Sequence, residues 1–193
     1  MLRSGLIYLS GAGWARNLVM NVGITRRMAR RFVAGETLDE TVAACRELNQ
    51  EGLTATLNYL GESVERAEDT EAVVEEYQRI ARRIHDEGLQ ASISIKPTHL
   101  GLDLSEELCQ TNLRHILTTA QECGVSVTID MESSKVLEVT LKIYRTMRDE
   151  YGFDNVGTVT QSYLRRTADD MRELAAEGAH IRLVKGAYLE APD

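Results

Sequence analysis

The residues best suited to chemistry in this chain stand at the ends of short apolar runs. Five runs have the character of β-strands, and they cover residues 53–60, 89–96, 125–130, 156–161 and 180–185. The side chains at their carboxyl ends carry charge or hydrogen-bonding groups: Asn58, Lys96, Asp130 with Glu132, Gln161, and Lys185-Gly186-Ala187. Parallel strands present their carboxyl ends at one face, where α/β folds bind ligands, so we expect these groups to gather in one place.

Two of these side chains are charged and suit the binding of small polar ligands. Lys96 ends a run in which alternate residues share one face, so it points the same way as Ser94. A lysine at this position can hold an anion such as a carboxylate, although a plain surface lysine is the simpler alternative. Asp130 can pair with a lysine or orient a cationic substrate, and its alternative role is to cap the next helix.

The last two runs offer groups that suit a flat heterocycle. Gln161 has an amide that donates and accepts at once, which fits a heterocycle edge better than acid–base work. Arg182 would be costly inside a barrel unless it met a carboxylate, a phosphate or an electron-rich ligand. Gly186 and Ala187 leave space for a flat ligand to approach the backbone. The last run and the residues that follow it are therefore the most suggestive segment.

Helix-like stretches separate the strand-like runs and must set their positions. They cover residues 69–87, 105–123, 133–151 and 165–177, and a glycine directly follows each of them. Glycine readily takes the left-handed conformation that ends a helix. A further helix over residues 37–50 opens on Thr37 with Glu40 three residues later, the spacing of a capping box. Residues 1–36 are predicted to form an N-terminal helical segment.

Alternating strands and helices fit either an open doubly wound sheet or a closed (β/α)8 barrel of the TIM type. A doubly wound dinucleotide-binding sheet carries a glycine-rich turn after its first strand, whereas residues 61–63 here read Gly-Glu-Ser. The barrel is therefore favoured, and residues 37–193 are predicted to form an α/β domain with about five parallel strands. A barrel needs eight strands and about 250 residues. We therefore expect a partial barrel that lacks about three strand–helix units.

Composition argues against several classes of protein. The formal net charge of −8 speaks against nucleic-acid binding, which needs a basic footprint. No stretch approaches the ~20 apolar residues of a membrane span. The three cysteines are far apart and suit reduced thiols in a cytoplasm. The sequence shows no closely spaced metal ligands and no H-E-x-x-H or G-x-S-x-G motif, so we expect neither a metal site nor a hydrolytic triad.

Four segments at the strand ends, taken together and in this order, resemble the proline dehydrogenase family. They read SIKPTHLG at residues 94–101, IDME at 129–132, VGTVTQSYL at 156–164 and IRLVKGAY at 181–188. Each would be weak alone, but four in order are strong. The resemblance covers most of the chain from about Leu38 onward.

The resemblance implies an FAD-dependent barrel enzyme that oxidises L-proline to 1-pyrroline-5-carboxylate, the first step of proline catabolism. Hydride would pass from the proline ring carbon next to nitrogen to flavin N5, so the flavin would supply the redox chemistry. Electrons would then pass to a quinone-type acceptor. The expected location is the cytoplasm, with at most peripheral contact with the inner membrane.

Residue roles follow from the same resemblance. Lys96 matches the lysine that meets the substrate carboxylate, Asp130 matches the active-site aspartate, and Arg182 matches the arginine beside the flavin. Arg182 would help to stabilise negative charge on the reduced ring. The positions that match the FAD lining are Met131, Gln161, Lys185, Gly186 and Ala187.

These residues lack the later strands that bind the FAD pyrophosphate and adenine in the family, and its paired substrate-binding arginines. We therefore expect the chain alone to bind FAD and proline poorly, and the complete protein to be the enzyme. Two alternatives stay open. One is a different (β/α)8 barrel enzyme, either a flavin-dependent enzyme that acts on a folate or an amine, or an enzyme without a flavin. The other is an inert fragment, or one that needs a second chain to complete the barrel.

Overall fold

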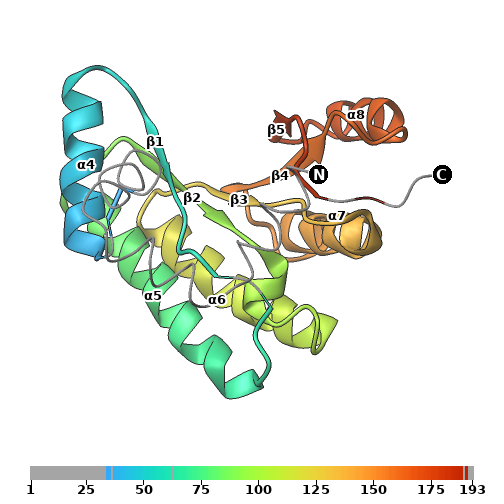
Figure 1. Ribbon diagram of the computed structural model, residues 1–193, viewed down its shortest axis with the longest axis horizontal. Coiled ribbons are helices and arrows are strands. Elements are labelled where there is room, and N and C mark those ends of the chain that lie inside the picture. The colour runs from blue at the N-terminus through green and yellow to red at the C-terminus, as the bar shows by residue number, and fades with distance from the viewer. Residues whose placement is uncertain (1–33, 36, 62, 189, 191–193) are drawn as a thin grey trace, which may run out of the picture. The chain divides into compact units, whose positions relative to one another are not determined.

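A computed structural model describes residues 34–35, 37–61, 63–188 and 190 of the 193-residue chain (Figure 1). The predicted N-terminal helical segment lies outside these residues except for positions 34 and 35. The chain divides into two compact units, residues 1–47 and 48–193. Helix α4 (Leu38–Gln50) opens on the predicted capping box. The Glu40 N–H donates to Thr37 Oγ1, and the Thr37 N–H donates to the Glu40 carboxylate, each over 3.3 Å.

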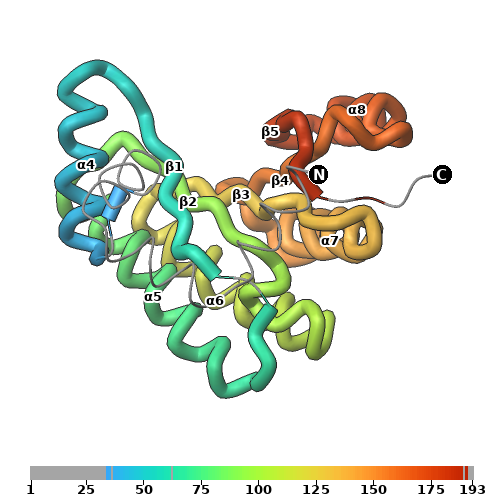
Figure 2. The backbone as a smooth tube through the Cα atoms, in the orientation of Figure 1, coloured from blue at the N-terminus to red at the C-terminus, as the bar shows by residue number. Residues whose placement is uncertain are grey.

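The second unit is built on one parallel five-stranded sheet. Its strands follow the chain order, so each strand pairs with the next one in the sequence. The bounds are β1 Ala55–Leu57, β2 Ala91–Ile95, β3 Val127–Ile129, β4 Val156–Gln161 and β5 Ile181–Val184. The tube in Figure 2 shows a sheet that curls like half of a barrel, and this confirms the predicted α/β partial barrel.

Helices connect the strands and follow the outer side of the curled sheet (Figure 1). Their bounds are α5 Ala67–Asp86, α6 Glu106–Glu122, α7 Leu137–Arg145 and α8 Thr167–Ala176. The start of α6 shows why one of them begins where it does. The Ser105 side chain accepts the Leu108 N–H over 3.3 Å, and two glutamates occupy the first turn, where they favour the helix dipole.

On β2 and β3 the strand register separates a polar inner face from an apolar outer face. On the inner face Ser94 lies opposite Thr128, and Thr128 lies opposite Gly157. On the outer face Ile93 lies opposite Val127, and both are fully buried. Because side chains alternate along a strand, the apolar face of β2 and β3 packs on the helices while their polar face is left for the barrel interior. Strand β4 differs, since Val159 lies on the inner face and Thr158 lies on the outer face.

One predicted helix is interrupted. The stretch 133–151 consists of a 3-10 turn η2 (Ser134–Val136), the helix α7, and a π-helical segment η3 (Thr146–Glu150). The helix begins late because side chains outside it hold the chain that precedes it. The Ser134 N–H donates to the Glu190 carboxylate over 2.9 Å, and Gln161 binds the backbone before it. A further 3-10 turn, η1 (Pro97–Leu100), directly follows the end of β2.

Candidate active site

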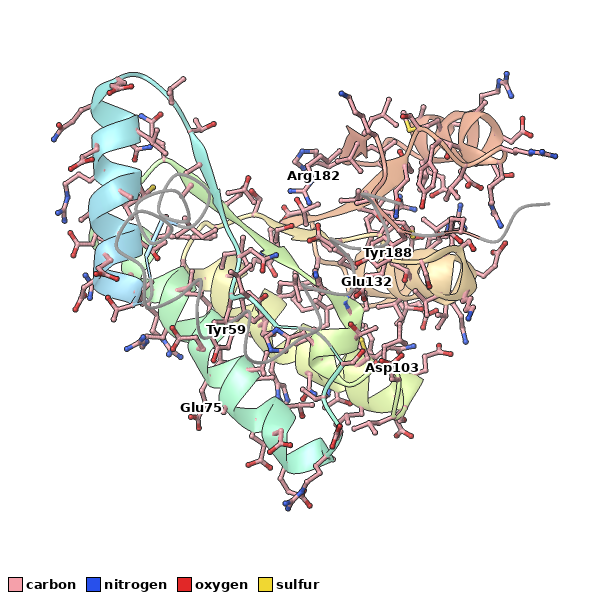
Figure 3. All side chains as sticks on the ribbon, in the orientation of Figure 1. Tyr59, Glu75, Asp103, Glu132, Arg182 and Tyr188 are labelled. Carbon is pink, nitrogen blue, oxygen red and sulfur yellow. The ribbon has the colours of Figure 1, made fainter. Side chains whose placement is uncertain are left out.

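An ion pair joins the end of β3 to β5. An Arg182 guanidinium nitrogen contacts Asp130 Oδ1, and the same nitrogen lies 2.9 Å from Ser94 Oγ. Figure 3 labels Arg182 among the side chains of the sheet. The Ser94 hydroxyl in turn donates to Asp130 Oδ1 over 2.6 Å. The Asn58 amide lies 3.5 Å from the other Asp130 oxygen. Four strands or strand ends, β1, β2, β3 and β5, thus contribute one polar cluster.

The parallel register explains why these residues meet. The Asp130 N–H donates to the Ile95 carbonyl over 2.8 Å, so strand pairing continues past β3 and fixes the aspartate beside β2. Arg182 lies opposite Val159 of β4, on the same face of the sheet. The side chains of Asp130 and Arg182 are 18% and 38% exposed, so the pair is partly desolvated. The charge on the partly buried aspartate is compensated by the arginine and the hydroxyl.

A cavity of about 430 Å³ opens at this cluster. Its charged lining residues are Lys96, Asp130 and Arg182. The remaining lining residues offer apolar or aromatic surface: Met131, Val159, Val184, Ala187 and Tyr188. A mostly apolar cavity with a few charged groups is typical of a small-molecule site. Two cations against one carboxylate favour a ligand that carries negative charge.

The cavity brings together most of the residues predicted from the sequence. Lys96, Asp130, Met131, Arg182 and Ala187 all line it. Of the three partners expected for a barrel-facing Arg182, namely a carboxylate, a phosphate or an electron-rich ligand, the structure shows a carboxylate, that of Asp130.

Gln161 does not line the cavity but lies beside it, opposite Val184 in the register. The side chain is almost fully buried, and its amide nitrogen donates to the backbone carbonyls of Met131 over 2.9 Å and Glu132 over 2.6 Å. Its Oε1 atom is buried and has no hydrogen-bond partner among the described residues. One half of the amide therefore holds the backbone, while the buried oxygen of the other half lies next to Gly186.

Lys185 and Gly186 also lie outside the cavity lining. Lys185 is exposed, and its carbonyl accepts the Tyr163 N–H over 3.2 Å. Gly186 has a φ of +106°, and a Cβ there would stand 1.9 Å from the Tyr163 ring. The room that this glycine provides is used by Tyr163 on that side. Cofactor contacts of Lys185 and Gly186 stay predictions.

Sequence reasoning left out three lining residues, Val159, Val184 and Tyr188. The period-2 pattern of the strands was the signal for the two valines, since Val184 shares a face with Arg182. Tyr188 follows the last strand, where no periodicity places it.

Two properties of the described residues bear on the class of site. Across the described residues, no three histidine, cysteine, aspartate or glutamate side chains come together as a metal ion would require. In the same part of the chain, no helix combines the length and apolar character needed to cross a membrane.

A partial parallel barrel with a charged cavity at the carboxyl ends of its strands is the architecture of a barrel enzyme. The profile of the family described as proline dehydrogenase matches residues 41–192, and the chain belongs to this family. It is 43% identical over 191 residues to proline dehydrogenase 1 of Bacillus subtilis strain 168 and 36% identical over 166 residues to the proline dehydrogenase of Deinococcus radiodurans.

The Bacillus subtilis match covers 99% of this chain but 62% of the relative, and the Deinococcus match covers 84% and 54%. The chain thus spans just over half to three fifths of the length of these relatives. Among solved structures, proline utilization A (PutA) from Bdellovibrio bacteriovorus, inactivated by N-propargylglycine, superposes with a TM-score of 0.76 at 24% identity. That match covers 85% of this chain and 20% of PutA, and it supports the barrel fold.

Proposed function

We propose that this chain forms the first part of an FAD-dependent proline dehydrogenase site, in which L-proline is oxidised to 1-pyrroline-5-carboxylate. The observation that carries the proposal is the junction of Arg182 and Asp130 in the cavity that Lys96 also lines. Membership of the proline dehydrogenase family supports the substrate. In this proposal the rest of the barrel corresponds to the part of the relatives that this chain does not match.

The residues around the cavity fit a flavin ring. Two buried polar atoms, Gln161 Oε1 and Arg182 Nε, have no hydrogen-bond partner within the described residues. Leaving such atoms unpaired is costly, and the ring edge of a flavin offers both N–H groups and acceptor atoms that can satisfy them. Met131 and Val184 add apolar surface for a flat ring. In the proposal these four residues hold the flavin together with Lys185, Gly186 and Ala187.

A bound flavin supplies an acceptor for the two electrons that proline loses. The chain supplies position and charge. The Lys96 ammonium binds the proline carboxylate, and the Arg182 guanidinium favours negative charge on the group beside it. Asp130 holds Arg182 in place through their ion pair and through the Ser94 hydroxyl. The apolar lining limits the access of water. A quinone-type molecule is the proposed final electron acceptor, which implies peripheral contact with a membrane.

The test uses a hybrid in which this chain is joined to the part of Bacillus subtilis proline dehydrogenase 1 that it does not match. We expect the hybrid to bind FAD and to reduce a dye when proline is added. Lys96→Ala should raise the KM for proline at least tenfold, because it removes a charge-assisted hydrogen bond worth about 1.5–3 kcal/mol. Lys142→Ala is the matched control, because Lys142 lies on α7 and pairs with Glu106 over 2.7 Å. Equal KM values for the two variants would show that the site is misassigned.

A further inference from the structure

Glu132 is a buried carboxylate that the proposed reaction does not use. It is 4% exposed and follows Asp130 by two residues. Both of its oxygens accept hydrogen bonds from one residue: Oε2 from the Thr98 N–H over 3.0 Å, and Oε1 from the Thr98 hydroxyl over 2.8 Å. Burying a charged carboxylate is costly unless such bonds compensate it. The glutamate therefore holds its partner firmly.

Thr98 lies in the turn that directs Lys96. Lys96 is the residue that precedes the 3-10 turn η1, and its carbonyl accepts the His99 N–H over 3.1 Å. Pro97 has no N–H, so the Thr98 N–H is the first donor that this turn offers. That donor has no partner inside the turn, and the Glu132 carboxylate satisfies it. Glu132 thus fixes the backbone two residues beyond Lys96.

The backbone of Glu132 is fixed in its turn by Gln161. The Gln161 amide nitrogen donates to the Glu132 carbonyl over 2.6 Å and to the Met131 carbonyl over 2.9 Å. One continuous set of hydrogen bonds therefore joins the carboxyl ends of β4, β3 and β2. A shift at Glu132 would move Thr98 and, with it, the attachment point of Lys96.

We propose that Glu132 is a positioning residue that directs the Lys96 side chain into the cavity through Thr98. The inference rests on the proposed function in one respect, namely that Lys96 binds the substrate carboxylate. It goes further by assigning the correct placement of the Lys96 ammonium group to Glu132, a buried residue that does not line the cavity. The ligand class it serves is a small carboxylate.

The first experiment reads the order of Lys96 in the 193-residue chain without any activity. The chain has four lysines, so reductive methylation with carbon-13 gives few signals, and Lys96→Arg identifies the one from Lys96. We expect two resolved methyl signals from an ordered Lys96. Thr98→Val and Glu132→Leu should merge them into one, whereas Thr98→Ser, which keeps the hydroxyl, should leave them resolved. If Glu132→Leu does not fold, the two Thr98 variants decide the question.

The second experiment uses the active hybrid and separates substrate positioning from general stability. Thr98→Val should raise the KM for proline by roughly tenfold and leave kcat within a factor of two, since a misplaced lysine weakens carboxylate binding. Thr98→Ser should restore the KM. An unchanged Lys96 methyl pattern in Thr98→Val overturns the inference. A hybrid without proline oxidation would instead contradict the proposed function, and the methyl pattern would still decide the role of Glu132.

Discussion

Arg182 on β5 pairs with Asp130 at the end of β3 across the intervening strand β4. Both residues also bind the Ser94 hydroxyl, which comes from β2. Because the two charges lie 52 positions apart in the sequence, the contact exists only when the strands have assembled in register. The ion pair should therefore stabilise the folded chain as well as shape the cavity.

A double-mutant cycle measures this pair. Asp130→Ala should lower the free energy of unfolding by about 1–3 kcal/mol, because it leaves a partly buried guanidinium without its carboxylate. With Arg182→Met as the second substitution, urea unfolding of the parent, the two single variants and the double variant should give a coupling energy of about 1 kcal/mol. The exposed pair of Asp169 and Arg172 is the control, and it should show no measurable coupling. Equal coupling in both pairs would contradict the partly buried geometry.

Glu177 should make the free energy of unfolding depend on pH below about pH 4.5. Hydrogen bonds from Arg145, and further bonds from Arg148, lower the pKa of the Glu177 carboxyl below its ordinary value of 4.5. A lowered pKa in the folded state means that the stabilisation is complete above pH 4.5 and is lost as the pH falls through the folded value. Glu177→Gln should therefore unfold at lower urea than the parent at pH 7, and the difference should shrink toward pH 3. A constant difference across this range would contradict the expectation.

The cysteines should differ in reactivity. Burial raises the pKa of the Cys109 thiol to about 12, and its Sγ–H faces the Pro97 carbonyl at 3.5 Å. Cys123 lies at the end of α6 and is partly exposed, although burial also raises its pKa. Thiolate is the reactive form, so iodoacetamide at pH 8 should modify Cys123 well before Cys109, which should react only on unfolding. Peptide mass mapping over time measures both rates, and early labelling of Cys109 would count against its burial.

Gly186 should tolerate alanine less well than Gly124. Both have positive φ, but a Cβ at Gly124 meets nothing within 4 Å, whereas at Gly186 it collides with the Tyr163 ring. Gly124→Ala should cost about 1 kcal/mol of stability, from backbone strain alone. Gly186→Ala should cost about 1–3 kcal/mol more through overpacking. Adding Tyr163→Ala to Gly186→Ala should recover part of that extra cost. Thermal unfolding of the parent, the two glycine variants and this double variant tests the expectation. No recovery would mean that Tyr163 does not occupy the space.

The strand ends could be predicted because two regular features combine there. Alternation along each strand places Lys96, Asp130 and Arg182 on one face, and strand–helix alternation makes the strands parallel. Both features are local, so the half-barrel and the placement of these three residues in the cavity could be predicted from the sequence. The family resemblance, and not the alternation, indicated Met131.

The exact partners could not be predicted, because they depend on how neighbouring strands are staggered. The sequence indicates that Arg182 needs a compensating group, but not that Asp130 and Ser94 provide it. The bond between Glu132 and Thr98 depends on two irregular turns, η1 and the segment after β3, for which no periodic pattern exists. The break of the predicted helix 133–151 has the same origin. Glu190 binds Ser134 within this stretch, and Gln161 binds the backbone directly before it, both from distant parts of the chain.

The most direct test of the proposed site is a single-turnover measurement on the hybrid with the Bacillus subtilis relative. The enzyme is mixed with L-proline without oxygen, and the absorbance of the oxidised flavin is followed. We expect bleaching in the parent, bleaching slowed by about a hundredfold or more in Arg182→Met, and an unchanged rate in Arg172→Met, whose arginine is exposed on α8. A flavin-loaded hybrid that proline fails to bleach, or equal rates in the two arginine variants, would contradict the proposed site.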